Sequence, residues 1–189
     1  MKKHLLALLF YVGFISMTNA QIIQNTLDAD GNRHIICENE NVRSFTDKIV
    51  TYVHLSYLNG QYRLFFTFYA LAPISINEGG RVLIKTENGK TLSFNIAASD
   101  SDNIGTLIST SFGIISQYSI TTHVNLSKED IINLSSGVTK FRIEMSNIEL
   151  PNGYFDKEFK SDKIGEKVLT DYRAIGKALK ETKSFEDGF

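Results

Sequence analysis

Residues 47–71 read DKIVTYVHLSYLNGQYRLFFTFYAL, two runs of alternating apolar and polar side chains that meet at Asn59-Gly60. Both turn residues tolerate the positive φ angles of a two-residue type I′ turn, so this stretch predicts a β-hairpin. Such a turn pairs Leu58 with Gln61. A slip by one residue would mix apolar and polar side chains on each face, so the pattern also determines the register.

The predicted hairpin has two faces of different character. The first face is apolar and is expected to be buried; it carries Ile49, Val53, Leu55, Tyr57, Tyr62, Leu64, Phe66 and Phe68. The second face mixes aromatic and polar side chains, and its candidate binding residues are Tyr52, His54, Arg63, Phe65 and Tyr69. Aromatic residues beside arginine are typical of binding hot spots, so the second face is a candidate binding surface. The alternative is that a helix or a second sheet covers it and makes it ordinary core.

A second hairpin is predicted over residues 81–86 and 90–97. A three-residue loop between these runs, with Gly89 in the left-handed conformation, is the connection that keeps the apolar residues together. The side chains that then share one face are Val82, Ile84, Leu92, Phe94 and Ile96.

The composition changes after this hairpin. Residues 98–105 are polar and predict a loop. Residues 103–127 contain no Asp, Glu, Lys or Arg but many Ser, Thr, Ile and Val, which predicts two strands that meet near Gly113. We expect these strands in the middle of a sheet; the alternative is an edge that pairs with another chain.

Two helices are predicted in the second half of the chain. Ser127 and Asp130 lie at the spacing of a capping box and predict the start of a short helix. Residues 161–183 predict an amphipathic helix, because apolar side chains recur there at helical spacing. Gly165 and Gly176 fall on the apolar side, which predicts a close approach to a sheet. The apolar stripe consists of Ile164, Val168, Tyr172, Ile175 and Leu179.

Many short strands separated by glycine-containing turns favour a mainly β fold. We expect an antiparallel β-sandwich with a short inserted helix and a C-terminal amphipathic helix. A closed β-barrel with a terminal helix is the alternative. No repeat or low-complexity linker interrupts residues 21–189, which predicts a single domain.

Residues 1–20 read as a secretory signal, with Lys2 and Lys3 before an apolar core and a small-residue exit at Ala20. The apolar run is too short to span a bilayer. The protein is therefore expected to be exported, either to the periplasm or outside the cell. The single cysteine, Cys37, lies in an apolar run and is expected to be a small hydrophobic residue of a strand.

The composition disfavours several functions. Without the signal, the chain has 18 basic and 21 acidic side chains, and no cluster of Lys and Arg is present. This composition argues against a nucleic-acid partner. No catalytic motif is present, and the few histidines show no zinc spacing, so we expect no catalytic residue, metal or cofactor. Residues 28–32, DADGN, begin like a calcium loop but lack the later ligands, which favours a turn.

Two segments carry a resemblance. Residues 79–94, GGRVLIKTENGKTLSF, and residues 124–145, VNLSKEDIINLSSGVTKFRIEM, follow a lysine-led signal. This combination resembles the small exported β-rich proteins, mostly uncharacterised, of gut Bacteroidetes. The resemblance implies an envelope or extracellular location and transfers no catalytic residue.

Three functions remain open from the sequence. The first is a non-enzymatic binding module at the cell envelope, with a protein or a glycan as its partner. The second is a secreted hydrolase of glycans or peptidoglycan that uses a carboxylate pair formed only in the fold. The third is a structural subunit that self-assembles through residues 103–127. The absence of Trp disfavours an aromatic sugar platform, although eight Tyr are present.

Overall fold

The computed structural model describes residues 21–29, 31–42, 48–110, 113–148, 150–159 and 163–186. The predicted signal, Asp30 of the calcium-like loop and Asp47 at the start of the first hairpin lie outside the described residues.

The described chain is mainly β, with ten strands and two helices. The strands are β1 (Ile22–Leu27), β2 (Arg33–Cys37), β3 (Glu40–Asn41), β4 (Val50–Leu58), β5 (Gln61–Ala70), β6 (Arg81–Thr86), β7 (Thr91–Thr110), β8 (Gly113–Leu126), β9 (Val138–Glu144) and β10 (Tyr154–Glu158). The helices are α2 (Lys128–Leu134) and α3 (Ile164–Glu186). In the described residues, no helix is long and apolar enough to cross a bilayer.

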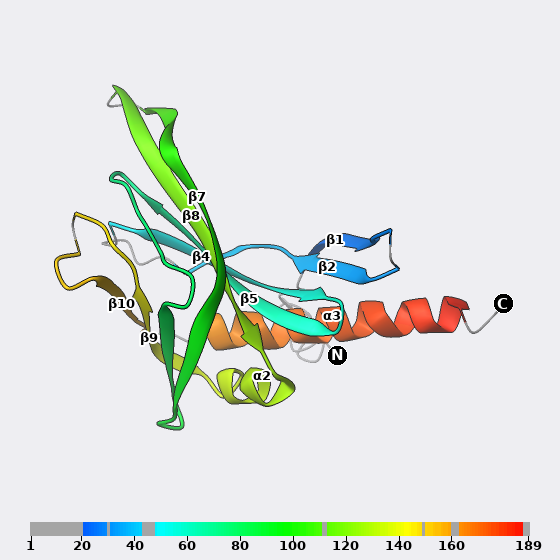
Figure 1. The fold of residues 1–189 in the computed structure, drawn as a ribbon. Helices are drawn as coiled ribbons and strands as arrows, with labels where there is room; N and C mark the ends of the chain where they lie inside the picture. Colours follow the sequence, from blue (N-terminus) through cyan, green and yellow to red (C-terminus); the bar gives the residue numbers. More distant parts are fainter. Residues whose placement is uncertain are drawn as a thin grey trace, which may run out of the picture.

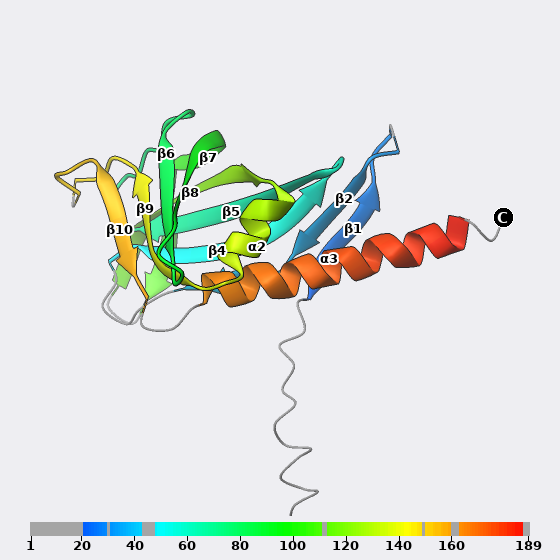
Figure 2. The same cartoon turned by 90° about the horizontal axis from the view of Figure 1, so that it is seen from below.

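All strands belong to one antiparallel sheet with the order β1-β2-β4-β5-β8-β7-β6-β9-β10, and β3 pairs with β4. The sheet folds over at β7, whose 20 residues pair with β6 at one end and with β8 at the other. Strands β6, β9 and β10 therefore stand across β4 and β5 as a second layer (Figures 1 and 2). This confirms the predicted antiparallel sandwich with helices. The closed barrel is wrong, because β1 and β10 end the sheet without pairing with each other in the described chain.

The first hairpin has the predicted register. Leu58 pairs with Gln61 and Val53 with Phe66. Asn59 and Gly60 have φ angles of 50° and 83°, as a type I′ turn requires. The predicted apolar face is buried except for Tyr57, which is partly exposed and packs against the core.

A cluster of phenylalanine rings joins the two layers. Phe66 and Phe68 on β5 lie with their ring centroids 5.7 and 6.5 Å from that of Phe141 on β9. Phe155 on β10 lies 6.1 Å from Phe68. Aromatic pairs at such distances contribute about 0.5–1.5 kcal/mol beyond their buried area, so this cluster holds the folded sheet together.

The second hairpin is confirmed, and the loop predicted after it is wrong. Val82 pairs with Phe94, and Gly89 has a φ of 84° in the three-residue loop. Strand β7 then continues through residues 98–105, because β8 supplies hydrogen-bonding partners there that the polar sequence does not reveal. The register shifts between Asp102 and Thr106, so the polar segment contains an irregularity but no break.

Helix α2 begins as predicted, and both helices pack largely as predicted; α3 begins at Ile164, and its predicted start at Ser161 lies outside the described residues. Ser127 and Asp130 form the capping box of α2. Helix α3 packs its apolar stripe against β4 and follows the sheet (Figure 2). It continues to Glu186, three residues beyond its predicted end. The close approach predicted for Gly176 is wrong, since a Cβ atom added there would meet no atom within 4 Å.

Asp171 of α3 replaces a missing strand partner of β4. Strand β2 pairs with β4 as far as Ser56, and β3 begins pairing at Val53, which leaves a gap between them. The Leu55 N–H in this gap donates to Asp171 Oδ2 at 3.0 Å. Lys167 Nζ lies 2.7 Å from Asp171 Oδ1, and the two side chains are only 10% and 0% exposed. The carboxylate thus joins the helix to the sheet edge with a paired, buried charge.

Cys37 is buried next to this carboxylate, as its apolar setting predicted. Its Sγ lies 4.0 Å from the Asp171 carbonyl oxygen, and the side chain is fully buried. Burial, together with the negative charge of Asp171, raises the pKa of the thiol to about 12. The thiol is therefore protonated at neutral pH and unreactive.

Asp171→Ala is expected to lower the free energy of unfolding by about 3–5 kcal/mol. The change leaves the Lys167 ammonium buried without its carboxylate and the Leu55 N–H without its acceptor. As a control, Lys177→Ala removes the ammonium of an exposed pair with Glu181 and should cost less than about 1 kcal/mol. Urea unfolding measures both values; similar losses for the two variants would contradict the structural role of Asp171.

Candidate functional site

The five residues predicted as a binding surface all lie on the outer face of β4 and β5. Their neighbours Val53, Leu55, Leu64 and Phe66 point to the core, and the five alternate with them and are partly exposed. Both helices and the second layer pack on the opposite, inner face (Figures 1 and 2). The helix or second sheet that was the alternative cover for this face therefore lies on the opposite side of β4 and β5. The binding role of the face stays a prediction. We call this surface, together with His123 of the neighbouring strand β8, the aromatic face. Its residues are Tyr52, His54, Arg63, Phe65, Tyr69 and His123.

Three rings stack across three strands of the aromatic face. His54 and Phe65 are stacked with centroids 4.8 Å apart and planes 4° from parallel. Phe65 also stacks on His123 of β8, again at 4.8 Å. The sequence predicted β8 as a strand but not its neighbour, so His123 was missed. Its pairing with Phe65 is decided only by the position of β8 beside β5.

Both histidines of the stack are neutral at pH 7. Burial lowers the pKa of His54 to about 4, and the positive charge of Lys167 contributes. Burial, assisted by Arg63, also lowers the pKa of His123. His54 Nδ1 lies 2.6 Å from Asn39 Oδ1, which fixes the ring in its place. The stack is thus a rigid, uncharged surface.

Two buried polar atoms of the aromatic face have no partner among the described residues. They are Arg63 Nε and Ser56 Oγ, and the two residues pair across β4 and β5. Both atoms are buried within the protein, so an external partner cannot reach them without a local rearrangement.

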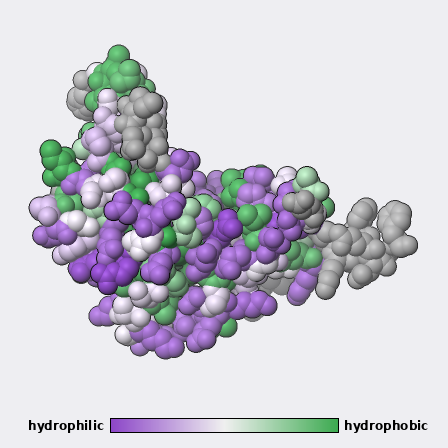
Figure 3. Space-filling view, viewed as in Figure 1, coloured by the Kyte–Doolittle hydropathy of each residue, from purple (hydrophilic) through white to green (hydrophobic). Residues whose placement is uncertain are grey.

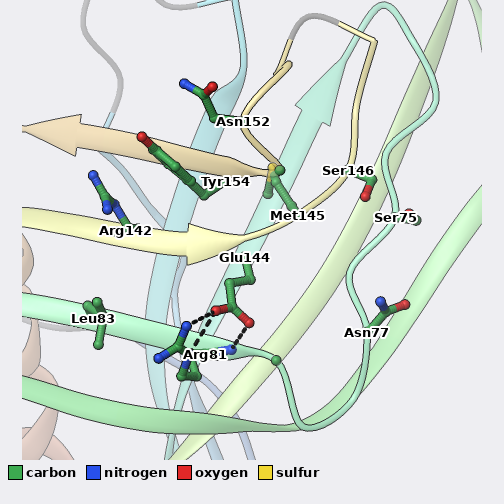
Figure 4. A pocket seen from close by; sticks show the side chains of 12 residues that line it. Ser75, Asn77, Arg81, Leu83, Arg142, Glu144, Met145, Ser146, Asn152 and Tyr154 are labelled. Atoms are coloured by element: carbon green, nitrogen blue, oxygen red, sulfur yellow. Dashed lines mark hydrogen bonds and ion pairs between the residues drawn. The ribbon is translucent and has the colours of Figure 1, made fainter.

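The structure also contains a polar cleft that the sequence analysis missed (Figure 4). It has a volume of about 570 Å³ and lies at one end of β6, β9 and β10. Two loops complete it, one before β6 and one between β9 and β10. Ser75 and Ser146 join these loops through reciprocal backbone hydrogen bonds of 3.0 and 2.8 Å. In sequence each loop shows only ordinary turn residues, and no local signal connects them.

Two arginines of the cleft are paired with carboxylates. Arg81 Nε donates to Glu144 Oε1 at 2.8 Å, and the Arg81 backbone N–H donates to Oε2 at 3.0 Å. These hydrogen bonds hold the pKa of Glu144 below its usual range. Arg142 binds both Asp156 oxygens at 2.5 and 2.7 Å, and its Cζ lies 3.9 Å from the centre of the Tyr154 ring.

Four other polar side chains of the cleft are free. Ser75, Asn77, Ser146 and Asn152 lie around its opening in Figure 4, and within the described part of the chain their side chains have no hydrogen-bond partner. The cleft therefore combines fixed charged groups with unused hydroxyl and amide groups, all of which can bind a polar ligand.

The described residues do not bring metal ligands together. No group of three His, Cys, Asp or Glu side chains among them is close enough to hold an ion. In the calcium-like loop, Asp28 accepts hydrogen bonds from the backbone and side-chain N–H groups of Asn32 at 2.8 and 3.1 Å. The Asp28 carboxylate thus stabilises the turn.

The low pKa of His54 predicts acid sensitivity. Its pKa is about 4 in the folded state against an ordinary value of 6.5, so the unfolded state binds the proton first as the pH falls. The stability contributed by neutral His54 is therefore complete above pH 6.5 and is lost between 6.5 and about 4, with a maximum of about 3 kcal/mol. Urea unfolding at neutral pH and near pH 4 measures how much stability acidification removes. The His54→Gln variant should lose less stability between these two pH values than the wild type. Equal losses would contradict the burial of His54.

Comparison of the chain with known protein families, with curated protein sequences and with solved structures finds no match. The resemblance to exported proteins of gut Bacteroidetes stays a prediction. The function is therefore inferred from the geometry and chemistry of the described residues.

Proposed function

We propose that the protein is an exported, non-enzymatic binding module whose polar cleft holds a neutral, polyhydroxylated ligand, a glycan of the cell envelope. The observation that carries the proposal is that Ser75, Asn77, Ser146 and Asn152 all line a cleft of about 570 Å³, and that their side chains have no partner in the described chain. Each sugar hydroxyl donates and accepts hydrogen bonds. Hydroxyl and amide side chains match this pattern because they also offer donors and acceptors.

The charge balance of the cleft supports a neutral ligand. The guanidinium of Arg81 is paired with Glu144, and that of Arg142 is paired with Asp156. An anionic ligand such as a phosphate would have to compete with these carboxylates, and nucleic acid binding requires concentrated, uncompensated positive charge. The paired arginines instead present oriented N–H groups without net charge.

The same geometry favours binding over hydrolysis. A glycoside hydrolase needs two carboxyl groups on either side of the scissile bond, and one of them must be protonated to act as the acid. Glu144 is the only carboxyl side chain among the described residues that line the cleft. Arg81 lowers its pKa, so Glu144 is ionised and occupied. A non-catalytic site is the simpler account of these groups.

Binding of neutral oligosaccharides to residues 21–189 tests the proposal by calorimetry or NMR titration. The double variant Asn77→Ala/Asn152→Ala should bind at least about tenfold more weakly, since it removes two amide groups that contact the ligand, each worth about 1 kcal/mol. Asn125→Ala, an exposed asparagine on β8 outside the cleft, is the matched control and should bind like the wild type. Equal affinity of all three proteins would contradict the site. Release of shorter sugars, lost in Glu144→Gln, would instead support the hydrolase.

The aromatic face favours protein binding as a second candidate function. Its ring stack is partly exposed on the outer face of the sheet, and the partly exposed Arg63 and Tyr52 belong to the same face. Arginine and aromatic side chains dominate the binding energy of protein interfaces.

A pull-down from envelope extracts tests this second function. The folded Tyr52→Ala/Arg63→Ala variant should lose a protein that the wild type retains, because the change removes an aromatic contact and the arginine of the face. Arg173→Ala, an exposed arginine on α3, should retain it. Equal retention by all three would show that the aromatic face is not the binding surface.

A further inference from the structure

We propose that the protein forms a two-fold dimer in which the end of β8 pairs with the same segment of a second copy. The segment belongs to the arm, which we define as residues 106–110 of β7 and residues 113–117 of β8. The arm is a hairpin that projects beyond the rest of the sheet (Figure 1). The proposal is independent of the ligand assigned to the polar cleft.

One edge of the arm is open because β8 extends beyond its neighbour β5. Strand β5 pairs with β8 only as far as Ala70, which lies opposite Tyr118. The chain turns away there, and Pro73 cannot donate a hydrogen bond to a strand. Residues 114–117 of β8 pair with β7 on one side, and on the other side they have no strand neighbour in the described chain.

The arm has none of the usual protection of an exposed strand edge. Natural sheets block such edges with charged residues, especially lysine, or with proline. Residues 103–127 contain no charged side chain and no proline. Two of its exposed side chains are large and apolar: Leu107 is 70% exposed and Ile114 is 73% exposed. Figure 3 shows hydrophobic side chains gathered at the end of the arm.

An apolar cleft of about 690 Å³ lies directly beside the open edge. Ile115 and Tyr118 of β8 form one wall, and Leu71, Pro73 and Ile148 belong to the segments opposite. Leu71 and Ile148 are 66% and 87% exposed. A strand added to β8 would occupy the place that β5 leaves and would bury these side chains, which provides a hydrophobic driving force for pairing.

A second copy is the occupant that this edge fits. Two identical charge-free edges meet without repulsion, and an antiparallel strand pair is related by a two-fold axis, so each copy offers the donors and acceptors that the other needs. The opposite edge of the arm, on β7, is less suitable because its register shifts between Asp102 and Thr106. Pairing through β8 is therefore expected.

Sedimentation of residues 21–189 over a range of concentrations, with matched lysine variants, tests the dimer. Ile114→Lys should raise the dissociation constant at least about tenfold, because it places like charges near the two-fold axis. Ile132→Lys is the control, since Ile132 on α2 is 67% exposed and lies outside the arm. It should dimerise like the wild type.

The variants Ile114→Cys, Ile115→Cys, Ser116→Cys and Gln117→Cys, made one at a time, test the geometry of the pair. Residues directly opposite in an antiparallel pair lie close enough for a disulfide only near the axis. One or two of these variants should therefore form disulfide-linked dimers under mild oxidation, and the exposed control Lys128→Cys should not. The native Cys37 does not interfere, because it is fully buried.

Four results would overturn the proposal. They are a monomer at every concentration, a dimer unaffected by Ile114→Lys, a dimer lost equally in Ile132→Lys, and an absence of cross-linking at positions 114–117. A monomer that co-sediments with phospholipid vesicles, and loses this in Ile114→Lys, would assign the arm to a lipid surface instead. The proposal would be established by a dimer that Ile114→Lys weakens and Ile132→Lys does not, together with a disulfide cross-link at one or two of positions 114–117.

Discussion

The contact of Phe66 and Phe68 with Phe141 is the interaction on which the rest of the structure depends. In the sheet, β5 and β9 are separated by β8, β7 and β6, so no backbone hydrogen bond brings them together. Burial of these rings, at the centre of a core that both layers share, keeps the long sheet folded over at β7. Once it is folded, the inner surfaces become core and the helices cover the remaining inner side of β4.

The surfaces available for function are those that this folding leaves outside. The aromatic face lies on the outside of β4, β5 and β8, and the polar cleft lies at the end of β6, β9 and β10. Each contains side chains that are held in place: the rings of His54 and Phe65 stack, and Glu144 pairs with Arg81. Rigid groups lose little conformational entropy when a ligand binds, which is why both surfaces suit recognition. Helix α3 also affects the aromatic face, because the positive charge of Lys167 helps to lower the pKa of His54.

Sequence reasoning predicted the local elements and missed the contacts between distant ones. Asn59-Gly60, the capping box at Ser127 and the stripe on α3 each depend on residues close in sequence, and each is confirmed. Residues 98–105 were predicted as a loop because their polarity dominates locally, whereas β8 pairs with them and makes them a strand. Five residues of the aromatic face followed from one hairpin, but His123 depended on the position of β8.

The sequence by itself determined the hairpin register, the alternation of buried and exposed side chains, the start of α2 and the mainly β class, because backbone conformation and side-chain period are local properties. Tertiary structure alone decided which strands are neighbours, how far β7 extends, and that α3 covers the inner face. It also brought Ser75 beside Ser146 and Arg81 beside Glu144 to make the cleft. Such pairings join segments more than 60 residues apart, and they are selected by burial of the common core and not by any signal within either segment.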